Sequence, residues 1–319
     1  MKWLKHIFLA AAGLALLSIA WRNLPLHDLG QQLSKANYWL IIPVFSVTLF
    51  GYFVRIQRWQ ILYKNLNQKV SSRSAWISLS AGYLISYAIP RGGEVTRCLL
   101  VKRYNNVPFS QSLATVIMER LMDIVVLFLL VLSISVLNVQ QMTTFFQANI
   151  FNPLVQTITL TKVLVLGVIG VVLLVFMMKY INTKKQDKNW VDEFLSTCKQ
   201  LVFLQGKCAF LAYTLLLWFS YFMMTFLWVF AFAESAQMPM AQVFVIMVIG
   251  TIGKSIPIQG GGMGAYHYLV AQAFLLFGVG ALTGNALAII IHGAQTVYTI
   301  LTGSIAYGVL LYDEKNRNL

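Results

Sequence analysis

Long apolar stretches separated by short polar segments make up most of the chain. A helix that crosses a membrane needs about 20 predominantly apolar residues. Six stretches are close to that length or exceed it: residues 4–21, 38–55, 112–137, 162–180, 209–233 and 284–311. This pattern predicts an all-α integral membrane protein with about six transmembrane helices.

Two further apolar stretches, residues 75–89 and 241–256, are too short to cross and end at breaks rich in proline and glycine. Proline removes a backbone donor and glycine accepts a positive φ, so both suit a break within a membrane. We therefore expect two re-entrant helix hairpins, in which a short helix enters the membrane, breaks and returns. The expected hinge residues are Pro90, Gly92, Gly93, Pro257, Gly260, Gly261, Gly262 and Gly264.

The composition agrees with a membrane protein, because 58% of the 319 residues are hydrophobic and only 11% are charged. The formal net charge of +14 comes from 24 Lys and Arg against 10 Asp and Glu. The basic residues occur in short clusters between apolar stretches, which is typical of cytoplasmic loops beside anionic lipid. The charge therefore favours the inner cell membrane and argues against nucleic acid as a partner.

The distribution of Lys and Arg also predicts an orientation. With the N-terminus inside, 18 of the 24 fall in cytoplasmic segments, Arg55 and Arg58 among them, and the outer loops hold only Arg22 and Lys35. This count requires each short stretch to return to the side from which it came, and it places both termini in the cytoplasm. The first stretch is interpreted as a retained anchor, with a signal peptide cleaved near Ala20 as the alternative.

The two halves of the chain follow one plan, in which a spanning helix, a short half, a break, a second half and a long helix succeed one another. Because the first short stretch starts inside and the second outside, the halves are expected to be inverted repeats, as in many transporters. We expect one polytopic membrane domain over residues 1–319. Its parts are a first repeat at about 38–137, a linking helix at 162–180, a cytoplasmic loop at 181–208 and a second repeat at about 209–311.

Three ionisable residues fall within the stretch 112–137. Glu119 and Asp123 are four residues apart and share a helix face, and Arg120 lies within pairing reach of Asp123. With the inner boundary near Ser112, Asp123 lies about 16 Å deep at 1.5 Å per residue. A lone charge there costs about 3 kcal/mol, so we expect a partner or a water-filled cavity. A purely structural ion pair is the alternative.

Further polar residues lie at the two breaks and on the last apolar stretch, where His292, Gln295, Thr296 and Thr299 share one face. The expected substrate-binding residues are Arg91, Glu94, Arg97, Glu119, Arg120, Asp123, Lys254, His267 and His292. Histidines aside, the set holds four cations and three anions, which can bind a phosphate and tolerate an amine. For the histidines, hydrogen-bonded packing and a proton relay both stay open.

Neither a metal nor another cofactor is expected. The cysteines Cys98, Cys198 and Cys208 have no CxxC spacing, and the four histidines include no HExxH motif. The sequence therefore argues against a disulfide framework, a zinc site and a metal-dependent enzyme.

Several of these motifs resemble a known family. Three motifs carry the resemblance: Pro90-Arg91-Gly92-Gly93-Glu94 with Arg97, Pro108-Phe109-Ser110, and Glu119-Arg120 with Asp123. They resemble the membrane domain of lysylphosphatidylglycerol synthase/flippase proteins and their stand-alone relatives. The run Gly260-Gly261-Gly262-Met263-Gly264 is similar to the second signature of that family. It departs from the signature where Gly260 replaces a proline and where His267 stands near the position of a glutamate.

The resemblance implies a flippase-like lipid transporter with paired re-entrant helices around a central cavity. The substrate would be a polar phospholipid or a lipid-linked molecule. The full synthase also carries a soluble aminoacyl-transfer domain, for which the roughly eight residues after the last apolar stretch leave no room. We therefore expect this chain to flip a lipid made by another protein. Cationic site residues would contact phosphate, and the carboxylates would bind an amine, couple protons or hold the arginines.

Two other functions stay open. A membrane-embedded enzyme would modify a lipid-linked substrate with Glu119, Asp123 or His292 as acid or base, although no donor-binding motif supports it. A transporter of small solutes or ions would share the inverted-repeat architecture. The expected partners are a phospholipid or other polar lipid and the bilayer, with a homodimer left open.

Overall fold

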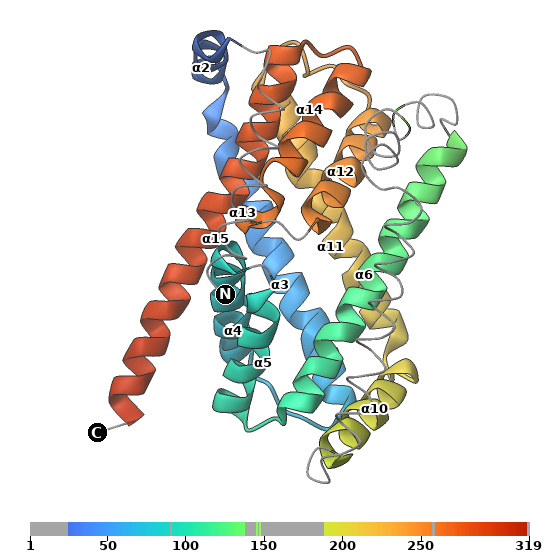
Figure 1. Ribbon diagram of the computed structural model, residues 1–319, viewed down its shortest axis with the longest axis vertical. Coiled ribbons are helices and arrows are strands. Elements are labelled where there is room, and N and C mark those ends of the chain that lie inside the picture. Colours follow the sequence, from blue (N-terminus) through green and yellow to red (C-terminus); the bar gives the residue numbers. More distant parts are fainter. Residues whose placement is uncertain are drawn as a thin grey trace, which may run out of the picture.

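The computed structural model describes residues 25–89, 91–137, 145, 147, 188–256 and 259–317. Within these ranges every regular element is a helix, and the helices form an elongated bundle (Figure 1). The elements are α2 (Leu26–Ser34), η1 (Tyr38–Leu40), α3 (Ile41–Asn65), α4 (Ser72–Ala88), α5 (Gly92–Asn105), α6 (Phe109–Leu137), α10 (Lys188–Val202), α11 (Lys207–Trp228), η3 (Val229–Ala231), α12 (Met240–Ser255), α13 (Gln259–Gly262), α14 (Ala265–Leu276) and α15 (Ala281–Arg317). The all-α prediction is confirmed for these residues.

Three helices of the described chain are long and apolar enough to cross a membrane, namely Tyr38–Asn65, Lys207–Ala231 and Ala281–Asn316. Each contains one of the predicted crossings or nearly all of it. The predicted crossing 112–137 forms one uninterrupted helix, α6, of 29 residues. The predicted crossings 4–21 and 162–180 lie outside the described residues. The part of the chain that the structure describes is thus all-helical, with several apolar helices as in a membrane protein.

The first short apolar stretch forms α4, which packs side by side with α5 across a break. At the break Ile89 is extended, with φ −124°, and Arg91 adopts a left-handed φ of +63°. At the far end of α5, the Asn105 side chain donates to the carbonyl oxygen of Lys69 at 3.2 Å. The pair therefore begins and ends at the same end of the molecule, and we call it hairpin 1.

Two glycines allow the helices of hairpin 1 to touch. A Cβ atom at Gly93 would lie 1.9 Å from the carbonyl oxygen of Gly82 and 2.2 Å from the Ser86 hydroxyl. Such contact between backbones is typical of helix packing in membranes, where small residues permit close approach. The expected hinge glycines thus include one whose main task is packing.

The second short stretch forms α12, which packs against α14 across a glycine loop. Gly260, Gly261 and Gly262 have φ values of +68°, +70° and +85°, a conformation that residues with a Cβ rarely adopt. The Glu234 carboxylate before α12 accepts hydrogen bonds from the Gly280 amide and the Thr283 hydroxyl after α14. This pair, hairpin 2, therefore also begins and ends at one end of the molecule, opposite to hairpin 1 (Figure 1).

The tips of the two hairpins meet beside α15. The glycine loop contacts α4, and the Tyr87 hydroxyl near the tip of hairpin 1 lies 3.2 Å from the Thr296 hydroxyl of α15. Helix α15 packs against α4 through Gly303 and against α14 through Gly284. In the described elements, a long helix, a pair of shorter helices and a second long helix follow one another twice, as α3 to α6 and as α11 to α15.

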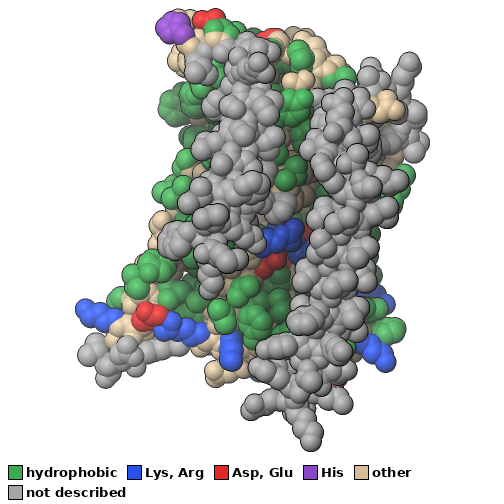
Figure 2. Space-filling model, viewed as in Figure 1, with side chains coloured by type: hydrophobic (Ala, Val, Ile, Leu, Met, Phe, Trp, Pro, Cys, Tyr) green, Lys and Arg blue, Asp and Glu red, His purple; other side chains and the backbone are tan. Residues whose placement is uncertain are grey.

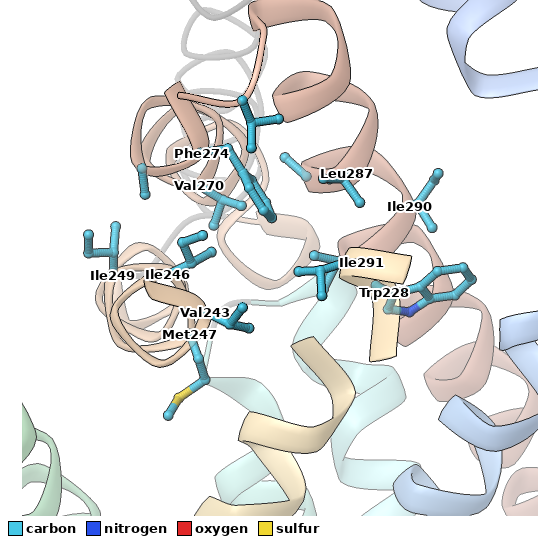
Figure 3. Close-up of a cluster of buried hydrophobic side chains, with 14 of the residues drawn as sticks. Trp228, Val243, Ile246, Met247, Ile249, Val270, Phe274, Leu287, Ile290 and Ile291 are labelled. Atoms are coloured by element: carbon cyan, nitrogen blue, oxygen red, sulfur yellow. The ribbon is translucent and has the colours of Figure 1, made fainter. Parts of the chain in front are cut away.

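The largest buried apolar cluster holds hairpin 2 in place (Figure 3). Its side chains include Val243 and Met247 of α12, Phe274 of α14, Ile291 of α15 and Trp228 of α11. Lipid tails are as apolar as these side chains, so in a membrane close packing, rather than exclusion of water, is what stabilises the contact. Hairpin 2 is thereby fixed against α11 and α15.

The interpretation of Arg55 and Arg58 as residues of a solvated segment after the helix is wrong. Helix α3 continues past both to Asn65, and their side chains are buried, with Arg58 0% exposed. The physical reason is that carboxylates of α6 compensate both charges inside the bundle. A count of basic residues beside apolar stretches cannot distinguish a compensated arginine from a solvated one.

Candidate functional site

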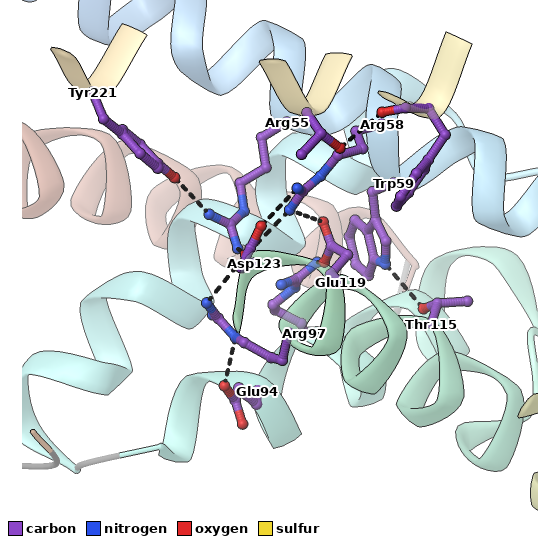
Figure 4. Close-up of polar contacts among 12 residues, drawn as sticks. Arg55, Arg58, Trp59, Glu94, Arg97, Thr115, Glu119, Asp123 and Tyr221 are labelled. Carbon is purple, nitrogen blue, oxygen red and sulfur yellow. Dashed lines mark hydrogen bonds and ion pairs between the residues drawn. The ribbon is translucent and has the colours of Figure 1, made fainter. Parts of the chain in front are cut away.

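Seven charged side chains from α3, α5 and α6 form one connected group, which we call the charged network (Figure 4). Its members are Arg55, Arg58, Glu94, Arg97, Glu119, Arg120 and Asp123. Each helix supplies residues one helical turn apart, so their side chains point to the same side of the helix. The network therefore occupies the junction of the three helices.

Glu119 is the centre of the charged network. Its carboxylate accepts hydrogen bonds from Arg97 Nη2 at 2.7 Å and from Arg58 Nη2 at 3.5 Å. Glu119 and Arg58 are both 0% exposed, and Arg97 is 1% exposed. Removing an ion from water costs several kcal/mol, so the Glu119 carboxylate depends on the two arginines and each arginine depends on a carboxylate. The centre is sealed from solvent and lipid.

The other side of the network is accessible. Asp123 accepts hydrogen bonds from Arg58 at 2.7 and 3.3 Å and lies 4.0 Å from Arg55. Arg120 donates to Glu94 at 2.9 Å and lies 3.8 Å from Asp123, so the predicted pairing of Arg120 with Asp123 is confirmed. The Arg120 side chain is 38% exposed. In the space-filling view, acidic and basic side chains are visible at mid-height (Figure 2).

Aromatic rings contact three of the arginines, Arg97, Arg55 and Arg58, the last of which lies 5.8 Å from the ring centroid of Phe210. The Arg97 guanidinium lies 4.0 Å from the ring centroid of Trp59, whose indole N–H donates to Thr115 at 3.0 Å. Arg55 donates to the Tyr221 hydroxyl at 3.1 Å and lies 5.5 Å from the ring of Tyr83. Cation–π contacts of desolvated groups contribute about 2 kcal/mol each. Tyr221 belongs to α11, so the network also reaches the second half of the chain.

The charged network has spare hydrogen-bond donors and spare positive charge. Several guanidinium nitrogens are buried without a hydrogen-bond partner among the described residues, namely Nε and Nη2 of Arg55, Nε of Arg58, and Nε and Nη1 of Arg97. Four arginines face three carboxylates, which leaves one excess positive charge. Guanidinium groups bind phosphate through paired N–H donors. The arrangement therefore suits an anion that approaches from the accessible side.

A second polar group lies at the tip of hairpin 2, and we call it the lysine–histidine cluster. Lys254 donates to the Gln295 side chain, and its ammonium group lies 4.7 Å from the ring centroid of Tyr266. The rings of His267 and His292 have their centroids 4.8 Å apart. The cluster thus joins α12 and α14 to the polar face of α15.

Both histidines bond to the backbone at the tip of hairpin 2. The Gly264 amide donates to Nδ1 of His267 at 3.3 Å, which caps the start of α14. Nε2 of His292 lies 3.4 Å from the Gly261 carbonyl oxygen, and because a carbonyl only accepts, this nitrogen is the donor. The histidines therefore hold the glycine loop in shape beside Lys254.

Eight of the nine predicted site residues fall in these two groups. Arg91 does not, since it is exposed at the break of hairpin 1. The hinge glycines lie at the two breaks, whereas Pro90 and Pro257 are outside the described residues. In the described part of the chain, no three His, Cys, Asp or Glu side chains are grouped so as to hold a metal ion.

The sequence reasoning missed Arg55, Arg58 and Tyr221 as members of the site. A usable signal was present for the two arginines. They are three residues apart and so share a helix face, and apolar residues continue beyond them as far as Leu62. Nothing in the sequence marks Tyr221 among the many aromatic residues of its helix.

Comparison with known protein families identifies the family of this chain. The sequence model of the lysylphosphatidylglycerol synthase TM region matches residues 4–303. Curated proteins and solved structures gave no match. The matched region contains both hairpins, the charged network and the lysine–histidine cluster.

Proposed function

This chain belongs to the family of lysylphosphatidylglycerol synthase TM regions, and from that premise we propose that it is a flippase-like transporter of a polar phospholipid or lipid-linked molecule. The head group binds at the charged network while the acyl tails stay in the bilayer. In this proposal the protein lies in the inner cell membrane with both termini in the cytoplasm, and the two hairpins are re-entrant inverted repeats.

The observation that carries the proposal is the charged network, which runs from a sealed centre to an accessible side. A phosphate that crosses the apolar core needs charge-assisted hydrogen bonds to replace its water. Arg120 on the accessible side is the first cation that an entering head group meets, and the unused donors of Arg55 beside Asp123 provide further bonds of this kind. The acyl tails need no binding site, because lipid already solvates them.

The arrangement of the hairpins supports transport between leaflets. Backbone groups freed at a helix break cannot face lipid, so the breaks must lie against protein or water. The two hairpins start from opposite ends of the molecule, and their broken tips meet beside α15. In this proposal, a head group that enters from either leaflet therefore finds polar contacts at a tip. Small movements of one half against the other then expose those contacts to one side at a time.

A transport assay with Arg120→Ala tests the proposed function. In vesicles that contain the purified protein and a fluorescent phospholipid, we expect the flipping rate to fall about tenfold or more, since a charge-assisted hydrogen bond is worth about 1.5–3 kcal/mol. Arg103→Ala is the matched control, because Arg103 forms an exposed ion pair with Glu314. Equal rates for the two variants would contradict a role of the network in transport.

Mass spectrometry of cellular lipids separates transport from lipid modification. Expression of the protein is expected to change which leaflet holds a lipid without producing a new lipid species. A new species that depends on Glu119 or Asp123 would favour the enzyme instead.

A labelling experiment tests the re-entrant topology. In a background without the native cysteines, an impermeant thiol reagent is expected to label Lys69→Cys and Lys102→Cys from one side of the membrane and Gln237→Cys and Ala281→Cys from the other. All four positions are exposed at the open ends of the two hairpins. Labelling of the first two positions from opposite sides would exclude a re-entrant hairpin 1.

A further inference from the structure

The supply of carboxylates in this chain restricts what its interior can bind. The sequence has 10 Asp and Glu residues, and all but Asp187, which directly precedes α10, lie in the described ranges. Three belong to the charged network, and Asp313 and Glu314 pair with arginines at the end of α15. The remaining four are Asp28, Asp192, Glu193 and Glu234, which lie on α2, on α10 and before α12. Few carboxylates are therefore left for other buried cations.

Lys254 is a half-buried cation to which the described residues offer no carboxylate. Its contacts are the amide oxygen of Gln295 and the ring face of Tyr266, which are both neutral, and no ion pair of the described residues includes it. The glycine loop presses against it, since a Cβ at Gly262 would lie 2.9 Å from the Lys254 Cα. The tip of hairpin 2 therefore holds a lysine for whose ammonium group the described residues supply no carboxylate.

A second excess of positive charge lies at the junction of α3, α5 and α6. The charged network has four arginines and three carboxylates, so it also keeps one excess positive charge. Thr296 follows Gln295, the partner of Lys254, and its hydroxyl lies 3.2 Å from the Tyr87 hydroxyl near the tip of hairpin 1, so Lys254 lies close to the place where the two hairpin tips meet. An uncompensated charge at membrane depth costs about 3 kcal/mol, which a bound anion offsets and a bound cation increases.

We infer that the proposed transport site selects lipids whose head group has a net negative charge, with the charged network as one anion contact and Lys254 as the second. This inference rests on the proposed function and adds its substrate class. A phosphodiester or phosphomonoester head group without an amine fits both contacts. A head group that carries an extra amine would lie beside Lys254 and the excess positive charge of the charged network. The carboxylates that could bind the amine already pair with arginines, so such a head group is expected to bind more weakly.

The test compares lipids that differ in head-group charge. Purified full-length protein in phosphatidylcholine nanodiscs is titrated with anionic phosphatidylglycerol, zwitterionic phosphatidylethanolamine or cationic lysylphosphatidylglycerol, and affinity is measured from the rise in melting temperature. We expect the dissociation constant of phosphatidylglycerol to be at least about tenfold lower than that of lysylphosphatidylglycerol, because one ion pair in a partly buried site contributes a free energy of that size. Inorganic phosphate in the same titration is expected to compete weakly. Competition equal to that of the lipid would assign the site to free phosphate.

Two variants locate the selectivity at Lys254. Lys254→Met removes the charge, and Gln295→Glu places a carboxylate of the same shape beside an unchanged lysine, so the second variant guards against failure of the first to fold. In both variants, the preference for phosphatidylglycerol over lysylphosphatidylglycerol is expected to fall to less than about threefold. Such a fall corresponds to the loss of most of the free energy of one ion pair. Lys64→Met, on the exposed end of α3, is the control that keeps the preference.

The outcomes separate the inference from the proposed function. Equal binding of the anionic and cationic lipids, or an unchanged preference in both variants, overturns the inference even if lipids are flipped. Selective binding of phosphatidylglycerol without any flipping supports the anion site and contradicts the transport function.

Discussion

Glu119→Gln is expected to destabilise the protein strongly. Arg58 and Arg97 both donate to this carboxylate, and all three side chains are almost completely buried. A neutral amide in its place leaves two guanidinium groups without their shared anion. Removing one partner of a buried ion pair costs about 3–5 kcal/mol of unfolding free energy. Thermal unfolding of the purified protein in nanodiscs measures the effect as a fall in melting temperature.

The same substitution at Glu314 is the matched control. Glu314 pairs with Arg103 on an exposed surface, where an ion pair contributes about 0–1 kcal/mol. The double variant Arg97→Met with Glu119→Gln removes one cation together with the anion, and it is expected to be less destabilised than the sum of its single variants by about 0.5–3 kcal/mol. Equal melting temperatures for Glu119→Gln and Glu314→Gln would show that no buried ion pair is present.

The lengths of the apolar stretches predicted the helices well, because helix length and apolar composition are local properties of the sequence. The stretches 75–89 and 241–256 became the short helices α4 and α12, and both breaks fall beside the expected glycines. The end of α3 was placed too early, because the first arginine was interpreted as the membrane boundary. A helix ends where its hydrogen bonds end, and the buried side chains of Trp59 and Leu62 continue the packing beyond Arg55.

The candidate site was predictable only in part. Glu119 and Asp123 stood out because two carboxylates on one face of an apolar helix need partners. The arginine that meets both of them is 61 and 65 positions away in the sequence, and its pairing depends on how α3 packs against α6. Spacing within one helix carries no information on that contact. Lys254 and Gln295, which are 41 positions apart, were missed as a pair for the same reason.

Gly93→Ala is expected to disrupt hairpin 1, although alanine is the better helix former. The new Cβ would lie 1.9 Å from the Gly82 carbonyl oxygen, a backbone atom that cannot rotate away, so α4 and α5 must separate. Overpacking of this kind costs about 1–3 kcal/mol or more. The cost also extends to the charged network, because Arg97 lies one helical turn beyond Gly93 and moves with α5 away from Glu119.

Gly293→Ala is the matched control for this prediction. Gly293 lies within α15, and a Cβ there would meet no atom within 4 Å, so the substitution is expected to leave the melting temperature unchanged or to raise it slightly. The measurements are the melting temperature and the yield of monodisperse protein for the two variants. A Gly93→Ala protein as stable as Gly293→Ala would mean that α4 and α5 do not touch through their backbones, and hairpin 1 would then lose the contact that fixes Arg97 beside Glu119.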